Sequence, residues 1–371
     1  MHSKQIITLL LVLLSSTVLI ASDFDWDAMP TGEWVVVLTT GVAAPKVFHG
    51  GATIAPDRHT VFFFGSDTHS PTELEMGETN ALWRLNLKRL EWVQDYEQDP
   101  MDTYQLLENG QCVTDSGRPW AMHTFDAVEY DPDSRKIVVI SYPVHTRFRP
   151  EERFPQFEGD WYQHLTPSHW EYDPDTRTWS RLETGPPNLF AKALAWDSNR
   201  HLMIGHDGAR TYHFRREEGQ WRSFDAPSSS AGYHLTMIHE SLSGRMLLLG
   251  RNGGSDILYA YDPDQHQWTV VPVKGATLPA NGSTMAFDNR NGVVLYLANQ
   301  HDNQYHNPTG KAVTFIFHSK EQRWEQLNVQ SPELYGMNYL MQYDPVRNVF
   351  LHFEKSVDTG DRLKLWAFRY R

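Results

Sequence analysis

One spacing constrains this chain more than any other: an apolar residue stands seven positions ahead of a tryptophan, again and again. In the clearest copy the two residues flank Asp173-Pro174-Asp175, a run that favours a turn because proline fixes φ and aspartate can accept hydrogen bonds from the backbone beyond it. Each copy therefore predicts a strand, a tight turn and a second strand, and recurrence of the unit indicates a repeat protein. The five pairs are Leu85–Trp92, Tyr172–Trp179, Phe214–Trp221, Tyr261–Trp268 and Phe317–Trp324.

A second hairpin precedes each of these units. Its second strand is almost wholly apolar, as in 137–140 and 246–249, which predicts a strand buried on both faces. Two hairpins make a four-stranded sheet, and six such sheets can be read. A seventh could lie within 93–122, although no second tryptophan unit marks it. The earlier hairpins cover 49–65, 123–141, 190–205, 233–250, 281–298 and 337–353, with turns near Asp57, Asp131, Asp197, Glu240, Asp288 and Asp344.

The two ends of the repeat region complement one another. Trp34 begins an apolar segment, 34–40, that has no partner hairpin before it. The segment 361–370 matches the strand before a repeat tryptophan, but no tryptophan follows it. We therefore expect the N-terminal strand to complete the last sheet, which closes a ring and pairs edges that would otherwise be exposed.

With these features the chain resembles kelch repeats and the propeller domain of galactose-oxidase-like proteins, from about residue 34 to the C-terminus. The resemblance rests on apolar strands that end near Gly65, Gly205 and Gly250, each followed by the paired residues seven apart. The double glycine of kelch repeats follows few of these strands, and Gly253-Gly254 is the nearest copy. The resemblance implies an all-β, kelch-like β-propeller, most simply of six four-stranded blades, with seven possible.

The first 22 residues look like a leader. Lys4 precedes an apolar run and a stretch of small residues, which is the pattern of a secretory signal peptide. The alternative is an uncleaved membrane anchor. We expect residues 1–22 to be removed and 23–371 to form a single propeller domain in a secreted or periplasmic protein. Cys112 is the only cysteine, so an internal disulfide is impossible.

Composition narrows the partners. Aromatic residues make up 13% of the chain and the formal net charge is −13. A strongly negative protein without a basic tract is a poor partner for nucleic acid or for an anionic membrane. We therefore expect no nucleic-acid partner, and no membrane association once the leader is removed.

Two segments interrupt the period, at 93–122 and 143–169. Both are long for loops in a compact domain, and such loops are usually functional or disordered. Their aromatic residues, among them Tyr104, Trp120, Phe148 and Trp161, favour ordered covers over one face of the propeller.

Propeller geometry predicts which residues meet at that face. The loop that enters the first strand of a blade and the loop that leaves the second strand lie at the same end of the central channel. Counting eight residues back from the turn acid places His49 and His123 at this mouth, with Tyr233 close by. Imidazole is suited to general acid–base work near neutral pH. We take His123, His49 and Tyr233 as candidate catalytic residues, and Arg251, His145, Asn281, His206, Asp207 and His301 as candidate substrate-binding residues.

This mixture of side chains suits a sugar. A set of histidine, tyrosine and arginine is similar in residue type to that of uronate-specific polysaccharide lyases on propeller folds, which implies β-elimination as a possible reaction. The competing hypothesis is a non-catalytic scaffold for protein or glycan binding. Asp67, Asp207 and Glu354 leave a glycosidase route open. No metal-ligand spacing is present, and galactose-oxidase copper chemistry is doubtful because Cys112 lies in an insertion. The sequence leaves the cofactor unassigned.

Overall fold

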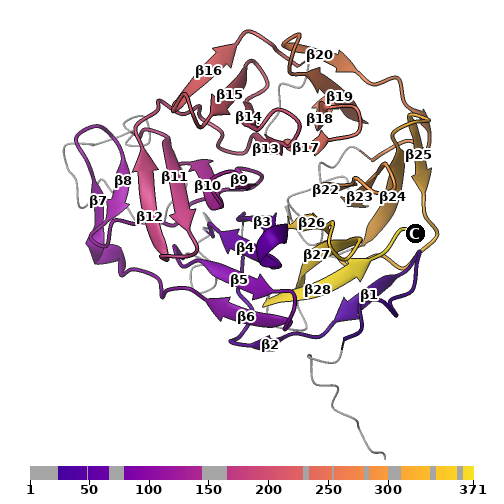
Figure 1. The fold of residues 1–371 in the computed structure, drawn as a ribbon, viewed down its shortest axis with the longest axis horizontal. Helices are drawn as coiled ribbons and strands as arrows, with labels where there is room; N and C mark the ends of the chain where they lie inside the picture. The colour runs from indigo at the N-terminus through magenta and orange to yellow at the C-terminus, as the bar shows by residue number, and fades with distance from the viewer. Residues whose placement is uncertain are drawn as a thin grey trace, which may run out of the picture.

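The computed structural model places six β-sheets in a ring around a central axis (Figure 1). The chain is therefore a six-bladed propeller, as expected from the repeats. The structure describes residues 24–47, 49–66, 79–143, 165–228, 234–252, 255–279, 284–299, 311–334, 340–356 and 362–371. The proposed leader lies outside these residues.

Each blade has four antiparallel strands, numbered here from the channel outwards. Blade 1 contains β3 (Gly51–Ala55), β4 (Thr60–Phe64), β5 (Trp83–Asn86) and β6 (Glu91–Gln94). Blade 2 contains β9 (Val128–Asp131), β10 (Lys136–Ser141), β11 (Ser168–Asp173) and β12 (Thr178–Leu182). Blade 3 contains β13 (Ala193–Asp197), β14 (Leu202–His206), β15 (Thr211–Arg215) and β16 (Gln220–Phe224). Blade 4 contains β17 (Thr236–Glu240), β18 (Arg245–Asn252), β19 (Ser255–Asp262) and β20 (Gln267–Val270). Blade 5 contains β22 (Met285–Asp288), β23 (Val293–Asn299), β24 (Ala312–His318) and β25 (Arg323–Gln326). Blade 6 contains β26 (Met341–Asp344), β27 (Val349–Ser356), β28 (Arg362–Phe368) and β1 (Trp34–Val37).

The residues seven apart in sequence are directly opposite one another on the third and fourth strands. All five pairs named above are cross-strand partners. Such aromatic and apolar pairs are the unit by which a sheet is stabilised. The seven-residue spacing in the sequence therefore predicts the strand register of each outer hairpin.

The sixth pair closes the ring. Trp34 on β1 lies opposite Phe368 on β28, and the indigo and yellow ends of the chain meet there in Figure 1. The Trp34 indole N–H donates a buried hydrogen bond of 2.9 Å to the Thr314 hydroxyl of blade 5. The expected closure by the N-terminal strand is confirmed.

Two short strands extend blades 1 and 5 beyond the expected four. β2 (Thr40–Gly41) pairs in parallel with β6, and β21 (Lys274–Gly275) pairs in parallel with β25. Gly41 and Gly275 have φ values of 90° and 87°, and an added Cβ would lie 2.4 and 2.1 Å from the carbonyl oxygens of Trp92 and Trp324. Only glycine fits so close a backbone approach.

The first interrupting segment folds partly into a hairpin. It contains a 3₁₀ turn, Met101–Thr103, and the paired strands β7 (Tyr104–Leu106) and β8 (Cys112–Thr114). Trp120 stacks on Tyr104 and shares a separate small core with Leu165. The Thr166 amide donates a 2.8 Å hydrogen bond to the Gly110 carbonyl, so the described end of the second interrupting segment contacts the first. A second 3₁₀ turn, Pro56–Arg58, joins β3 to β4.

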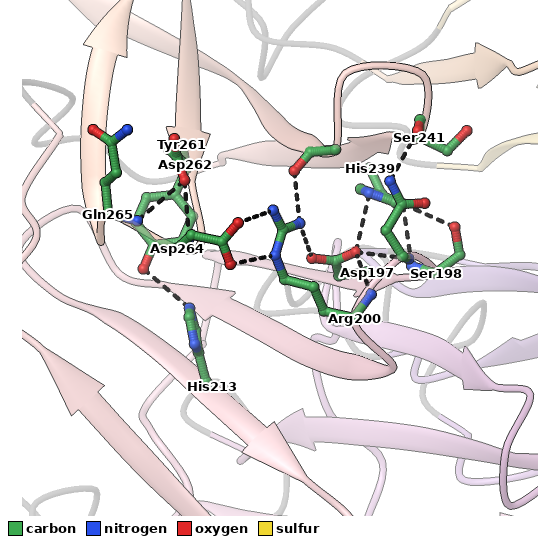
Figure 2. A network of polar contacts seen from close by, with 12 residues as sticks. Asp197, Ser198, Arg200, His213, His239, Ser241, Tyr261, Asp262, Asp264 and Gln265 are labelled. Carbon is green, nitrogen blue, oxygen red and sulfur yellow. Dashed lines mark hydrogen bonds and ion pairs between the residues drawn. The ribbon is translucent and has the colours of Figure 1, made fainter.

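Ion pairs join neighbouring blades at the end of the ring where first strands turn into second strands. We call this end the turn face, and the opposite end, where first strands begin, the entrance face. Arg58 of blade 1 binds Asp175 of blade 2 through two contacts of 2.7 Å. Arg200 of blade 3 binds Asp264 of blade 4 through contacts of 2.8 and 2.7 Å (Figure 2). Arg58 and Arg200 occupy equivalent turn positions, and so do Asp175 and Asp264. The same inter-blade contact, which we call a clamp, therefore occurs at two blade boundaries.

Candidate functional site

In the described part of the chain, four blades begin at the entrance face with a residue in the left-handed backbone region. Strand pairing makes Ala55, Asp131, Asp197 and Glu240 equivalent, because each lies opposite the residue five positions later. Six residues before them stand His49, Phe125, Ala191 and His234, with φ values of 56°, 47°, 53° and 67°.

This register corrects one prediction. Counting back from Asp57 and Asp131 made His49 and His123 equivalent. Asp57 lies in the 3₁₀ turn beyond the end of β3, so the equivalent of His49 in blade 2 is Phe125, and His123 lies two residues earlier.

Nevertheless His49 and His123 come together. Their rings stack with centroids 4.4 Å apart and planes inclined by 12°. Phe125 lies against both, at 5.6 Å from His49 and 5.3 Å from His123, and His234 meets the other side of Phe125 at 5.0 Å. His123 is 1% exposed, whereas His49 and His234 are half-buried. The imidazoles that can meet a ligand are therefore His49 and His234.

Backbone hydrogen bonds between blades hold this cluster in place. The His49 carbonyl accepts from the amides of Thr124 and Phe125, at 3.0 and 2.9 Å. The His234 amide donates to the Ala191 carbonyl at 2.7 Å. The Ser141 hydroxyl donates to the His123 carbonyl at 2.6 Å. The bonds of His49 and His234 cross from blade to blade, and the Ser141 bond ties His123 to its own blade. Together they hold the side chains in a fixed arrangement.

Half-exposed groups extend the cluster towards blade 3. Phe190 lies 5.9 Å from His123 and 6.2 Å from Tyr142, measured between ring centroids. The exposed Asn188 donates a 2.8 Å hydrogen bond to the Tyr142 hydroxyl. Lys192 follows on the same loop, and burial lowers its pKa although Asp207 acts in the opposite direction. We refer to His49, His123, Phe125, Phe190 and His234 as the mouth cluster.

Two other predicted residues make their hydrogen bonds outside this cluster. His206 is fully buried against Trp268, with its ring nitrogens 3.0 and 2.9 Å from the hydroxyls of Thr211 and Ser228. Burial lowers the pKa of His206 to about 4, so it is a neutral core residue. Asp207 accepts hydrogen bonds from its own turn and from Tyr212.

The remaining predicted residues cannot be placed at the mouth cluster. Arg251 lies in β18, and its side chain is outside the described part of the structure. Tyr233, His145, Asn281 and His301 lie outside the described residues altogether.

The central channel contains a cavity of about 500 Å³ that reaches the turn face. It is lined by the first strands of all six blades and by two carboxylates that the sequence reasoning missed, Asp126 and Glu129. Asp126 accepts a 2.9 Å hydrogen bond from the Met237 amide of blade 4. Glu129 accepts from the Tyr130 amide at 3.0 Å and from the Thr53 hydroxyl of blade 1 at 3.2 Å. In the sequence, the one feature that could have pointed to Glu129 is a carboxylate within the predicted first strand of blade 2.

Burial of these carboxylates favours their neutral forms. Glu129 faces the lumen, but protein surrounds it, and burial raises its pKa to about 7 against the effect of its two hydrogen bonds. Burial also raises the pKa of Asp126 well above its usual range, and the nearby charge of Glu129 adds to this.

Glu129→Gln should flatten the pH dependence of stability. A carboxyl whose pKa is higher in the folded state, about 7 against an unfolded value of about 4.3, binds more protons when folded, so wild-type stability falls as pH rises between these values. We expect the variant to be more stable than wild type by about 2–4 kcal/mol at pH 8, since each unit of pKa difference corresponds to about 1.4 kcal/mol and Glu129 is half-buried, and close to wild type at pH 4, in urea unfolding. Asp126 contributes a slope of the same sign, so some slope should remain. The exposed Glu97→Gln is the control, and equal slopes in wild type and Glu129→Gln would contradict the prediction.

Other chemistries find little support in the described residues. No group of three His, Cys, Asp or Glu side chains is arranged there to hold a metal ion. Within the same residues no helix is long and apolar enough to cross a membrane. Cys112 is buried and burial raises its pKa, which makes it a poor nucleophile.

Comparisons with known proteins agree with the repeat assignment. No protein-family model matches the sequence. The human Kelch-like protein 21 is 29% identical over 106 residues, which is 27% of this chain and 17% of that protein; the match thus spans about a sixth of the relative. The repeats and the ring of blades define a kelch-type β-propeller.

Similar solved structures include three from different sources. A structural genomics protein of unknown function from Bacteroides thetaiotaomicron has a TM-score of 0.49 and 10% identity, covering 91% of this chain and 72% of that one. TolB from Acinetobacter baumannii has a TM-score of 0.43 and 10% identity, covering 77% and 55%. A chain of a nidogen/laminin complex has a TM-score of 0.44 and 11% identity, covering 75% and 83%.

Proposed function

We propose that this protein is an exported propeller that binds carbohydrate at the mouth cluster. One observation carries the proposal: half-exposed imidazoles and aromatic rings are held together at one end of the channel by hydrogen bonds between blades. Aromatic rings offer apolar faces to sugar C–H groups, and a few convergent polar groups fix orientation, as in most small-ligand sites. The leader-like sequence supports export.

The described groups divide the work of binding. Phe190 and Tyr142 supply adjacent rings, with centroids 6.2 Å apart. His49 and His234 can donate to or accept from sugar hydroxyls, because a neutral imidazole does both. Lys192 and Asn188 add a cation and an amide at the blade 3 edge.

Processing of the bound sugar by β-elimination is the catalytic form of the proposal. His49, which is half-buried, takes the proton from the carbon next to the uronate carboxyl, whereas His123 is buried. The carbon–carbon double bond forms as the glycosidic C–O bond breaks, and the leaving oxygen takes its proton from Tyr233 or from water. His123 then acts as a positioning residue, stacked on His49.

Phe190→Ala and His49→Asn test the binding site. Asparagine tolerates the left-handed backbone that His49 adopts, so the second variant removes the imidazole without straining the loop. We expect affinity electrophoresis in gels containing xylan, β-glucan, alginate or polygalacturonate to retard wild type in at least one gel. Each variant should then weaken binding about tenfold. Trp196→Ala, which removes an aromatic ring that lines the channel cavity and is not part of the mouth cluster, should bind as wild type does.

The outcomes separate the hypotheses. Loss of binding in Trp196→Ala but not in Phe190→Ala would move the site into the channel. A wild type retarded by none of the four polysaccharides would contradict carbohydrate binding and favour the interaction scaffold. Release of unsaturated uronate from alginate or polygalacturonate, followed by absorbance and abolished in His49→Asn, would establish the lyase form.

A further inference from the structure

Among the described residues, the clamp found between blades 1 and 2 and between blades 3 and 4 is absent from the boundary between blades 4 and 5. At the boundary of blades 3 and 4, the Arg200 guanidinium of one turn binds Asp264 of the next (Figure 2). It also donates a 2.8 Å hydrogen bond to the Gly244 carbonyl. Strand register makes Ser243 the equivalent of Arg200, and Lys320 the equivalent of Asp264. Blade 4 thus has a neutral serine where blade 3 has the arginine. Blade 5 has a positive lysine where blade 4 has the negative aspartate.

The boundary between blades 4 and 5 contains a groove of about 600 Å³ on the turn face. Its lining includes Ser243, Gly292 and Lys320, the counterparts of the three clamp residues named above, together with the C-terminal Arg371. The groove therefore exists where the clamp would otherwise stand. We call it the 4/5 groove.

Basic side chains outnumber acidic ones in the lining of the 4/5 groove, and the main-chain carboxylate of Arg371 reduces this excess of positive charge by one. Four lining side chains are Lys or Arg and two are acidic, Glu240 and Glu321. Glu240 is 2% exposed and already bound by the Ser243 hydroxyl, with Arg245 3.8 Å away. Arg323 pairs with Glu325 at 3.1 Å.

Two cations at this groove have no acidic partner. Within the part of the chain that the structure describes, neither Lys320 nor the Arg371 side chain is engaged in an ion pair, and both are exposed. In a protein with a formal charge of −13, such a surface is a local exception to the overall field.

We propose that the 4/5 groove binds an acidic segment of a partner protein, whose carboxylates approach Lys320 and its neighbouring arginines. The occupant is identified by the clamps themselves, where arginine binds an aspartate carboxylate in the matching space. The site lies at the turn face, at the opposite end of the ring from the mouth cluster, and it does not depend on carbohydrate binding.

A labelled hexaglutamate peptide is the probe, followed by fluorescence anisotropy at low ionic strength with hexaglutamine as the uncharged control. We expect hexaglutamate to bind wild type and to be released by salt, because exposed charges are screened within about 8 Å at physiological ionic strength. Lys320→Glu should weaken binding about tenfold, since it replaces attraction by repulsion. Lys88→Glu is the matched control, because Lys88 is an exposed lysine at the same turn position of blade 1, and it should leave affinity unchanged.

A double variant, Ser243→Arg with Lys320→Asp, keeps the test independent of misfolding. It installs the residues of the Arg200–Asp264 clamp, so we expect hexaglutamate binding to be lost while the thermal midpoint stays equal to wild type or rises. Unchanged affinity in Lys320→Glu or in the double variant would overturn the proposal. The proposal would also be overturned if wild type bound dextran sulfate but not hexaglutamate, and if Lys320→Glu abolished the binding of dextran sulfate. That result would assign the groove to a sulfated polysaccharide.

Discussion

Trp34→Ala should lower the free energy of unfolding by about 3–5 kcal/mol, the usual cost of removing a buried tryptophan. Trp34 is 8% exposed, its ring centroid lies 5.2 Å from that of Phe368, and its N–H is bonded to Thr314. Because β1 is the fourth strand of blade 6, the lost contacts also hold the ring closed. Unfolding in urea measures the change, and hydrogen exchange should show faster exchange in β1 and β28 than in other blades.

Trp221→Ala is the matched control for closure. Trp221 occupies the equivalent position in blade 3, whose four strands are consecutive in sequence, and it is half-buried. We expect about 2 kcal/mol of destabilisation and no selective exchange in β1. Equal protection of β1 in both variants would contradict the role of Trp34 in closure.

Arg216→Met should lower the free energy of unfolding by about 3 kcal/mol at pH 7. Arg216 of blade 3 contacts two carboxylates of blade 2, Asp131 and Glu171, whose side chains are 3% and 1% exposed. Removing the cation leaves buried negative charge with less compensation, which costs far more than losing a surface ion pair. Lys136, 3.0 Å from Glu171, remains and limits the loss.

The cost of Arg216→Met should depend on pH. Burial alone would raise the pKa of Glu171, but hydrogen bonds from His169, Arg216 and Lys136 outweigh it and hold the pKa well below its usual range. A carboxyl with a depressed pKa stabilises the fold above its unfolded pKa of about 4.3, and this stability is lost as pH falls through the folded value. The gap between wild type and variant should therefore narrow below pH 4.

The control for Arg216 is Arg222→Met. Arg222 is 66% exposed and pairs with Glu218 at 2.8 Å on the same hairpin, so its loss should change stability by no more than about 0.5 kcal/mol at any pH. A pH-independent cost for Arg216→Met would show that packing, and not charge, is what Arg216 provides.

The outer hairpins could be predicted because their contacts are local. A tight turn fixes which residues face each other, so the seven-residue spacing of Tyr172 and Trp179 reports a cross-strand pair directly. Closure of the ring could be predicted from the same repeat pattern. One end of the repeat region has a tryptophan strand without a partner, and the other end has the partner strand without its tryptophan. The parallel strands β2 and β21 could not be predicted from the sequence. Only tertiary packing brings Gly41 and Gly275 against the backbones of β6 and β25.

The mouth cluster could be predicted in part. Loop topology placed His49 and His123 at one end of the channel, and their rings stack there. The same counting gave the wrong register for His49, because Asp57 belongs to a 3₁₀ turn that extends past β3. Phe125 and His234 were missed as members of the cluster, since their left-handed backbone is visible only in the folded chain.

The sequence by itself determined the blade and the closure and favoured six blades over seven, because each follows from repeated short-range pairs. The structure decided the number, since 93–122 holds only the hairpin of β7 and β8. The tertiary structure alone decided which side chains share a space across blade boundaries. Arg216 meets Glu171 from 45 residues away, Asp126 reaches blade 4, and the 4/5 groove opens where Ser243 and Lys320 stand in place of an arginine and an aspartate. Such contacts depend on how the six sheets are placed relative to one another around the central axis. The spacing of residues within one hairpin carries no information about that placement.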